Sequence, residues 1–239
     1  MVRITWLGHS TVQIELDGVR LLTDPVFRRW LLHMRRVALS PEAVEDVDAV
    51  LVSHLHHDHF DTRALARLGP ARVLVPSGTR VRTLGFEHVD VGESVEVGPV
   101  TVTATRAEHG KTRARGYLIS GSMRVYFAGD TDLFDGMRAL APVDIALLPI
   151  AGWGPRLPPG HLDPLRAAQA LELLRPRIAV PIHWGTYRRI GLSRDERVLR
   201  EPAASFAELA REHAPGVEVR ILPVGGSIDV SPVREAVAQ

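Results

Sequence analysis

The sequence predicts an α/β fold in which two mixed β-sheets lie between outer helices, a four-layer αββα sandwich. One observation is that residues 3–7 and 11–16 alternate apolar and polar side chains, as half-buried strands do. Another is that a strand-rich middle part is followed by three helix–strand units. A chain of 239 residues can bury a substantial core, so we expect a single domain over residues 1–239.

Short polar turns join the first strands. Asp17-Gly18, between the second strand and residues 19–22, is a strong signal for a two-residue hairpin. His9 lies in the turn between the first two strands, and Asp24 lies in the turn that ends the third. From the residues alone, His9 and Asp24 are as readily ordinary loop residues as functional ones.

Residues 26–40 have a different pattern. Phe27, Trp30, Leu31 and Met34 stand at positions i, i+3, i+4 and i+7, with arginines between them. This spacing predicts an amphipathic basic helix or a helical lid. We expect the segment to pack onto the body of the domain. The alternative is a surface for a phosphorylated or lipid substrate.

The rest of the chain is predicted as short elements in a regular order. Asp61 is expected to cap a helix over residues 62–68, which Gly69-Pro70 ends. Strands are expected at 72–75, 88–91, 94–97, 100–106, 117–120 and 124–128, with a helix over 78–84. The three helix–strand units place helices at 133–140, 164–174 and 202–213, and strands at 144–149, 177–182 and 217–222.

The segment Ser53-His54-Leu55-His56-His57-Asp58-His59 follows a buried apolar run and contains several potential metal ligands. Side chains of an extended backbone repeat every two residues, so His54, His56 and Asp58 can point to one side. His59 can turn to that side once the strand ends, whereas His57 should point away. Imidazole and carboxylate groups are ligands of zinc, or of manganese or iron at a similar site. The weaker alternative is a polar loop with chance histidines.

Three later strand ends carry further candidates. His109 follows the strand at 100–106, Asp130 follows an apolar strand and Gly129, and His183 closes the strand at 177–182. Glycine permits a close backbone approach, and a carboxylate at a strand end can bridge two cations. Because four separate strand ends each deliver metal-competent residues, we expect them to build one metal centre.

Composition narrows the class of protein. The chain has no cysteine, which excludes disulfides and thiolate ligands and leaves any metal to His, Asp and Glu. A formal net charge of +1 gives no reason to expect a nucleic-acid partner. No apolar run approaches the roughly 18 residues of a membrane span, and the N-terminus shows no signal-peptide pattern. We expect a cytoplasmic protein without stable membrane insertion; a peripheral contact through residues 26–40 and a homo-oligomer are left open.

The spacing His-x-His-x-Asp-His at residues 54–59 resembles the signature of the metallo-β-lactamase superfamily. Five further motifs narrow the resemblance: Trp6-Leu7-Gly8-His9-Ser10, Leu22-Thr23-Asp24-Pro25, Phe127-Ala128-Gly129-Asp130-Thr131, His161-Leu162-Asp163-Pro164 and Ile182-His183-Trp184-Gly185-Thr186. They are similar to the branch that contains the N-acyl-phosphatidylethanolamine-hydrolysing phospholipase D, with the L-ascorbate-6-phosphate lactonase as a looser relative. The similarity runs from Arg3 to about Tyr187.

The resemblance implies a set of seven metal ligands, which is too many for one tetrahedral ion. We therefore expect two divalent ions, with zinc as the first choice and manganese or iron as alternatives. By carry-over from the family, His54, His56 and His109 hold one ion, while Asp58, His59 and His183 hold the other, with Asp130 between them.

The resemblance also implies a metal-dependent hydrolase. A hydroxide that bridges the ions would attack a phosphodiester, a lactone or another ester of a small or lipid-like molecule. Asp130 and Asp58 are expected to take part in catalysis at the ions, and His161 to bind the oxyanion or protonate the leaving group. On the alternative interpretation, His161 merely precedes the helix at 164–174. Two other functions stay open, a dinuclear-iron redox protein and a metal-binding module without turnover.

Overall fold

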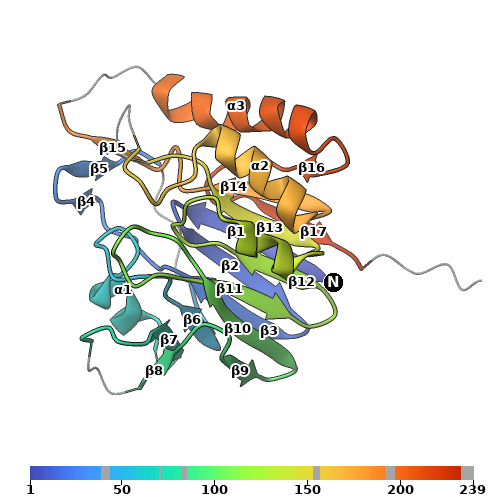
Figure 1. Ribbon diagram of the computed structural model, residues 1–239. Helices are drawn as coiled ribbons and strands as arrows, with labels where there is room; N and C mark the ends of the chain where they lie inside the picture. The colour runs from blue at the N-terminus through green and yellow to red at the C-terminus, as the bar shows by residue number, and fades with distance from the viewer. Residues whose placement is uncertain (39–43, 70, 82–84, 153–156, 192–196, 233–239) are drawn as a thin grey trace, which may run out of the picture.

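The computed structural model describes residues 1–38, 44–69, 71–81, 85–152, 157–191 and 197–232. Within these residues the chain forms two seven-stranded sheets packed face to face, with helices on the outer face of each (Figure 1). This arrangement confirms the predicted α/β sandwich of two mixed sheets flanked by helices.

The first sheet contains both antiparallel and parallel pairs. Its strands, in spatial order, are β17 (Ser227–Val230), β1 (Val2–Gly8), β2 (Thr11–Leu16), β3 (Val19–Thr23), β6 (Ala49–Leu51), β7 (Arg72–Pro76) and β8 (Phe86–Val89). Pairing is antiparallel from β17 to β3 and parallel from β3 to β8. The Asp17-Gly18 hairpin is confirmed, because Leu16 pairs with Val19 across it.

The second sheet is mixed in the same way. Its strands, in spatial order, are β16 (Glu218–Val219), β14 (Ile178–Ile182), β13 (Ile145–Pro149), β12 (Arg124–Phe127), β11 (Arg115–Ser120), β10 (Val100–Arg106) and β9 (Ser94–Val97). Pairing is parallel from β16 to β12 and antiparallel from β12 to β9. Every residue of β13 and β14 is buried, as expected for parallel strands covered on both faces.

Apolar side chains fill the three spaces between the layers. Phe127 belongs to the core between the two sheets. The helices α2 (Pro164–Leu174) and α3 (Arg197–His213) cover the second sheet, where Phe206 is fully buried. The helix α1 (Thr62–Arg67) covers the first sheet through Leu65. Asp61 caps α1 as predicted, because its side chain accepts the backbone N–H of Arg63 at 3.0 Å.

The helix predicted over residues 26–40 is wrong in its described part, residues 26–38. The strands β4 (Trp30–Leu31) and β5 (Met34–Arg36) form a hairpin that joins β15 (Tyr187–Arg189) in a small third sheet. Leu31 pairs with Met34 across the turn, and both side chains are buried. Residues that flank a two-residue turn oppose each other and are three positions apart, so the spacing of Leu31 and Met34 fits a hairpin as well as a helix. Residues 39 and 40 lie outside the described residues.

Other predicted elements differ mainly in extent. Residues 133–140 contain only a short 3₁₀ helix, η1 (Asp135–Leu140), whose N-terminus has no side-chain cap. No helix forms over residues 78–81, and 82–84 lie outside the described residues. The helix predicted to start at Pro202 starts earlier, at Arg197, so the proline lies inside α3. Strand 217–222 is reduced to β16, because only two of its residues pair with β14. None of the helices in the described ranges has both the length and the apolar character needed to cross a bilayer.

Candidate metal centre

Polar side chains gather where strands of the two large sheets end. In the first sheet, His54 follows β6 and leads into the loop that carries the other ligands of the motif. In the second sheet, His109 follows β10, Asp130 follows β12 and His183 follows β14. The structure brings all seven predicted metal ligands together, in overlapping groups whose ligand atoms lie within 4.8 Å of one another.

The first group consists of His54, His56 and His109. Nε2 of His109 lies 3.3 Å from Nδ1 of His56, and the ring centroids of His54 and His109 are 4.7 Å apart. His54 and His109 are buried, whereas His56 is exposed. This half of the centre therefore faces solvent.

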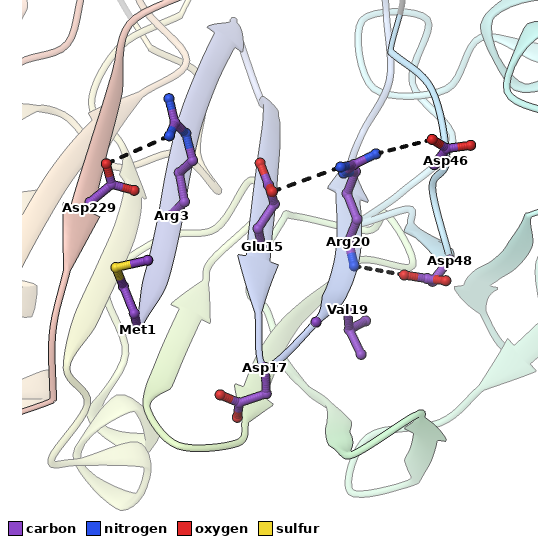
Figure 2. A pocket seen from close by; sticks show the side chains of 10 residues that line it. Met1, Arg3, Glu15, Asp17, Val19, Arg20, Asp46, Asp48 and Asp229 are labelled. Atoms are coloured by element: carbon purple, nitrogen blue, oxygen red, sulfur yellow. Dashed lines mark hydrogen bonds and ion pairs between the residues drawn. The ribbon is translucent and has the colours of Figure 1, made fainter.

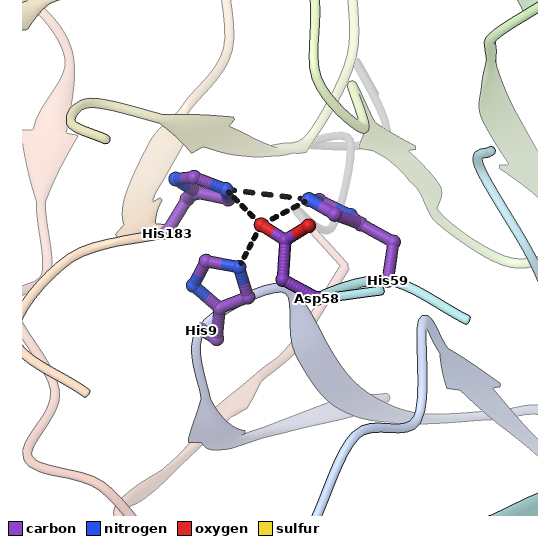
Figure 3. Close-up of side chains that lie close together, drawn as sticks. All are labelled: His9, Asp58, His59 and His183. Carbon is purple, nitrogen blue, oxygen red and sulfur yellow. Dashed lines mark hydrogen bonds and ion pairs between the residues drawn. The ribbon is translucent and has the colours of Figure 1, made fainter. Parts of the chain in front are cut away.

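The second group is organised around the carboxylate of Asp58. Its Oδ2 lies 3.5 Å from Nε2 of His59 and 3.7 Å from Nε2 of His183. Figure 3 shows this oxygen facing both rings and a third imidazole, that of His9, whose Nε2 is 3.1 Å away. The three ligands predicted for the second ion therefore meet, and a further histidine joins them.

Asp130 lies between the two groups. Its Oδ2 is 3.2 Å from Nε2 of His59 and 3.4 Å from Nε2 of His183. Asp130 also lies within ligand distance of His54, which belongs to the first group. The preceding Gly129 has a φ of 60°, and a Cβ there would stand 2.6 Å from the side chain of Ser53. A residue without a side chain is thus required for Asp130 to reach this position.

The outer nitrogens of two ligand histidines bind backbone carbonyls. Nδ1 of His109 donates to the oxygen of Gly160 at 2.8 Å, and Nδ1 of His183 donates to the oxygen of Ala151 at 2.7 Å. Because a carbonyl oxygen only accepts, Nδ1 carries the hydrogen in both rings. The lone pair of each neutral ring is then on Nε2, which faces the centre. Partners of this kind orient metal-binding histidines.

Asp24 orients His59 in the same way. The side chain of Asp24 is fully buried and accepts the backbone N–H of Ser53 at 2.6 Å and its hydroxyl at 2.5 Å. Its Oδ2 also lies 2.7 Å from Nδ1 of His59. The residues alone left Asp24 undecided, and the motif Leu22-Thr23-Asp24-Pro25 was the signal that distinguishes it from an ordinary turn residue.

The donor set fits divalent metal ions. His54 Nε2 and Asp130 Oδ1 are buried, and neither has a hydrogen-bond partner among the described residues. A buried polar atom left without a partner costs roughly 1–3 kcal/mol, which coordination of a cation would remove. Nε2 of His59 and Nε2 of His183 are only 3.3 Å apart, a separation that requires a proton or a cation between two ring nitrogens. Imidazole and carboxylate without thiolate suit zinc, manganese or iron.

The pKa values of the metal-free cluster are strongly shifted. Burial opposes charge on His59, but the carboxylates of Asp130 and Asp58 outweigh it and raise the pKa of the ring well above its usual range. Burial also opposes charge on Asp130, yet His183 and His59 hold the pKa of that carboxyl well below its usual range. Burial keeps the pKa of His54 low, so this ring is neutral. The proton between Nε2 of His59 and Nε2 of His183 thus occupies a site where a cation can replace it.

His9 is the site residue that sequence reasoning left undecided. Burial and the neighbouring His183 lower its pKa to about 3, so the ring is neutral. Although burial opposes it, the imidazoles of His59 and His183 hold the pKa of Asp58 well below its usual range. Because the resulting carboxylate only accepts, Nε2 of His9 carries the hydrogen and donates to Asp58. His9 therefore positions Asp58, and its signal in the sequence is the motif Trp6-Leu7-Gly8-His9-Ser10.

His161 lies beside the solvent-facing half of the centre. Its Nδ1 donates to the carbonyl oxygen of Pro158 at 3.1 Å, and its Nε2 lies 3.5 Å from Oδ2 of Asp130. Its ring centroid is 4.6 Å from that of His109. Burial lowers the pKa of His161, which favours a neutral ring with its lone pair toward the centre. The helix α2 spans 164–174 as predicted, with Asp163 as its cap and proline at the first helical position.

Arg36 supports the turn that carries His9. This arginine lies in the segment predicted to be an amphipathic basic helix or a helical lid, but its side chain is buried. Its guanidinium donates to the carbonyl oxygen of Leu7 at 2.7 Å and to that of Val26 at 3.2 Å. A Cβ on Gly8 would stand 2.7 Å from this guanidinium, so only glycine fits there. His57, in contrast, is exposed and belongs to none of the groups of potential ligands among the described residues.

A hollow of about 510 Å³ lies at the other end of the first sheet (Figure 2). The Asp17-Gly18 turn, which follows the last residue of β2, lines this hollow. His9 lies before the first residue of β2, at the opposite end of that strand. Its charges pair with one another, since Arg20 lies 3.9 Å from Glu15 and 3.8 Å from Asp46. This surface is therefore separate from the metal centre.

A sandwich of two mixed sheets with a His and Asp cluster at the strand ends is the arrangement of metallo-β-lactamase-type proteins. Residues 19–184 match the family described as the Beta-lactamase superfamily domain. A UPF0173 metal-dependent hydrolase of Aeropyrum pernix is 33% identical over 260 residues, which cover 96% of this chain and 98% of the relative. The chain belongs to the metallo-β-lactamase superfamily and, within it, to the UPF0173 family of metal-dependent hydrolases.

Solved structures agree on the fold. Igni18, a metallo hydrolase from Ignicoccus hospitalis, superposes with a TM-score of 0.69 at 24% identity, over 95% of this chain and 97% of that one. The isothiocyanate hydrolase from Delia radicum gut bacteria superposes with a TM-score of 0.73 at 18% identity, over 96% of this chain and 99% of that one. At these identities the similarity establishes the shared fold.

Proposed function

We propose that this chain is a hydrolase that works with two divalent metal ions, with zinc as the first choice and manganese or iron as alternatives. In this proposal one ion is held by His54, His56 and His109, and the other by Asp58, His59 and His183, with Asp130 between them. The observation that carries it is that two groups of three ligands meet at one carboxylate, that of Asp130. The metal-dependent hydrolases among the relatives support the same class of reaction.

When bound, two such ions lower the pKa of a water molecule toward 7 and so supply a nucleophile at neutral pH. The protein holds the ligands in place before the substrate arrives. His9 donates to Asp58, and Asp24 binds the outer nitrogen of His59. Because these partners are buried, the ligand side chains lose little further freedom during the reaction.

His161 is the residue that we propose for proton transfer. Its Nδ1 is occupied by the carbonyl oxygen of Pro158, so Nε2 is the atom that can exchange a proton. A neutral ring accepts a proton at Nε2 from the attacking water and then donates it to the leaving oxygen. In its protonated form the same atom can bind an oxyanion. The contact of His161 with His109, in the half of the centre where His56 is exposed, supports entry of the substrate on this side.

We propose an ester of phosphoric or carboxylic acid as the substrate, either a phosphodiester or a lactone, on a small or lipid-like molecule. The support is the set of motifs similar to the branch of the N-acyl-phosphatidylethanolamine-hydrolysing phospholipase D and the L-ascorbate-6-phosphate lactonase. In both reaction types the nucleophile attacks a phosphorus atom or a carbonyl carbon, and the oxygen bonded to that atom becomes more negative. A nearby dication stabilises this negative charge.

The test begins with metal-free protein that is reloaded separately with zinc, manganese or iron(II). Each form is assayed for metal content and against phosphodiesters, lactones and phospholipids. We expect two ions per chain and hydrolysis of one substrate class by the loaded protein only. One ion at saturation would contradict the dinuclear proposal. Consumption of dioxygen or peroxide by the iron form without hydrolysis would favour a redox protein, and two ions without any turnover would favour a binding module.

A further inference from the structure

Exposed large apolar side chains cluster on the small third sheet. Trp30 in β4 is 52% exposed, Leu32 in the β4–β5 turn is 73% exposed, and Ile190 after β15 is 55% exposed. The backbone N–H of Ile190 donates to the oxygen of His33 at 2.8 Å, which places Ile190 beside the turn that carries Leu32. Single exposed apolar residues are ordinary, but a group on one small element marks an interaction surface.

Arginines surround these apolar side chains. Arg35 pairs with Trp30 across the hairpin, and its guanidinium carbon lies 5.6 Å from the centre of the indole ring. Arg29 precedes Trp30, Arg189 precedes Ile190, and both are exposed. Residues 26–38 and 184–191, which build this sheet and its connections, contain no Asp or Glu. The surface is therefore apolar at its centre and positive around it.

We infer that this surface docks on a membrane that contains anionic lipids. We call it the exposed tip and define it as Arg29, Trp30, Leu32, Arg35, Arg189 and Ile190. Tryptophan favours the boundary between headgroups and acyl chains, where leucine and isoleucine side chains can also enter. Arginines at that depth bind lipid phosphates, and each contributes an attraction of about fivefold in partitioning to an anionic surface.

A second copy of this chain is the competing occupant of the exposed tip. In a two-fold symmetric dimer each patch would face itself, so arginines would be placed against arginines. Such like-charge contacts disfavour self-association, whereas a phosphate surface complements them. The charge pattern thus favours the membrane.

The small sheet that carries the exposed tip reaches the metal centre through Tyr187. Tyr187 in β15 presents its ring edge to His9, with the ring centroids 5.5 Å apart. Backbone pairing between Tyr187 and Arg36 joins β15 to the hairpin. In Figure 1, β4, β5 and β15 lie together at the left of the molecule, beside the sandwich. Docking through the tip would bring the metal centre next to the lipid surface.

Flotation of the full-length, metal-loaded protein with vesicles tests the inference. One vesicle type is pure phosphatidylcholine, and in the other about a third of the lipid is phosphatidylglycerol. We expect binding to the anionic vesicles, weaker binding to phosphatidylcholine, and loss of anionic binding in about 1 M salt, where charge interactions are screened beyond roughly 3 Å.

Matched variants separate the exposed tip from general charge and hydrophobicity. Arg35→Glu should lower anionic binding by at least about fivefold, whereas Arg138→Glu, the same charge change on the exposed side of η1, should lower it less. Leu32→Ser combined with Ile190→Ser should reduce binding, whereas Val91→Ser, at a residue 52% exposed in another part of the fold, should not. Circular dichroism and metal content show that each variant is folded.

Three outcomes would overturn the inference. The first is no binding of the wild type to anionic vesicles at low salt. The second is equal loss in Arg35→Glu and Arg138→Glu, which would show a general charge effect. The third is a dimer of the wild type in solution that Leu32→Ser with Ile190→Ser dissociates, which would assign the exposed tip to self-association. Each measurement is independent of the substrate, so the proposed hydrolase activity can fail while this inference holds.

Discussion

Replacing Asp24 by Asn should weaken binding of the metal ion that we propose for His59, although Asp24 is not itself a proposed ligand. Oδ1 of Asp24 accepts the backbone N–H of Ser53, so the amide oxygen of the variant must stay at that position. The amide nitrogen then replaces Oδ2 and faces Nδ1 of His59, 2.7 Å away in the wild type. Because an amide nitrogen donates, Nδ1 must accept, and the ring hydrogen moves to Nε2.

A hydrogen on Nε2 of His59 blocks the atom that faces Asp130 and His183. Loss of such an outer partner of a metal-binding histidine typically costs 10–100-fold in metal affinity or activity. We expect Asp24→Asn to lower the affinity for one of two ions by about this factor and to leave the other nearly unchanged. Competition with a chromophoric chelator measures both affinities.

Asp48→Asn is the matched control, because Asp48 also accepts a backbone N–H, that of Arg20 at 2.8 Å, but is exposed and remote from the centre. This variant should bind both ions as the wild type does. The reasoning is refuted if Asp24→Asn, folded by circular dichroism, keeps wild-type affinity for both ions.

Three further predictions concern the same centre. Asp130→Ala should lose most activity and part of the bound metal while the fold survives, because a carboxylate between two dications would offset their repulsion; unchanged turnover and metal content would rule out this role of Asp130. His161→Ala should lower kcat by roughly 10²–10⁴ with metal content near wild type, so parallel loss of metal in elemental analysis would make His161 a ligand, and full activity would make it a loop residue. Zinc binding to the metal-free protein at pH 6 should release about one proton per chain or more, because the carboxylates outweigh burial and keep the pKa of His59 above this pH. Calorimetry in two buffers of different ionisation enthalpy counts these protons, and no release would contradict a protonated His59.

The candidate ligands could be found in the sequence because each of their features is local. The motif at residues 54–59 follows a buried strand, and the two-residue repeat of extended backbone predicts that His56 turns toward the centre and His57 away from it. Asp130 and His183 each follow an apolar run, and His109 follows a strand that alternates apolar and polar residues. Strand ends are visible in a sequence as a change from apolar to polar residues, so these candidates needed no knowledge of the tertiary structure.

The partners of the ligands were decided only by the tertiary structure. His9 reaches Asp58 across 49 positions of sequence, and Asp24 reaches His59 across 35. No periodic pattern connects residues at such separations, so from the residues alone a positioning histidine and a turn histidine look the same. The motif at residues 6–10 marks His9, but its role follows only from the meeting of the turn after β1 with the loop after β6.

The segment at residues 26–38 shows the same limit in secondary structure. The spacing of Leu31 and Met34 fits a helix and a two-residue hairpin equally well, because both bring these residues, three apart, to one side. The hairpin is selected by contacts from distant parts of the chain: β15 pairs with β5, and the Arg36 guanidinium binds the carbonyl oxygen of Leu7. The sequence by itself determined the sandwich, the strand ends and the ligand types, since these depend on local alternation of apolar and polar residues. Long-range backbone pairing and burial decided the hairpin, the buried arginine and the orientation of each imidazole.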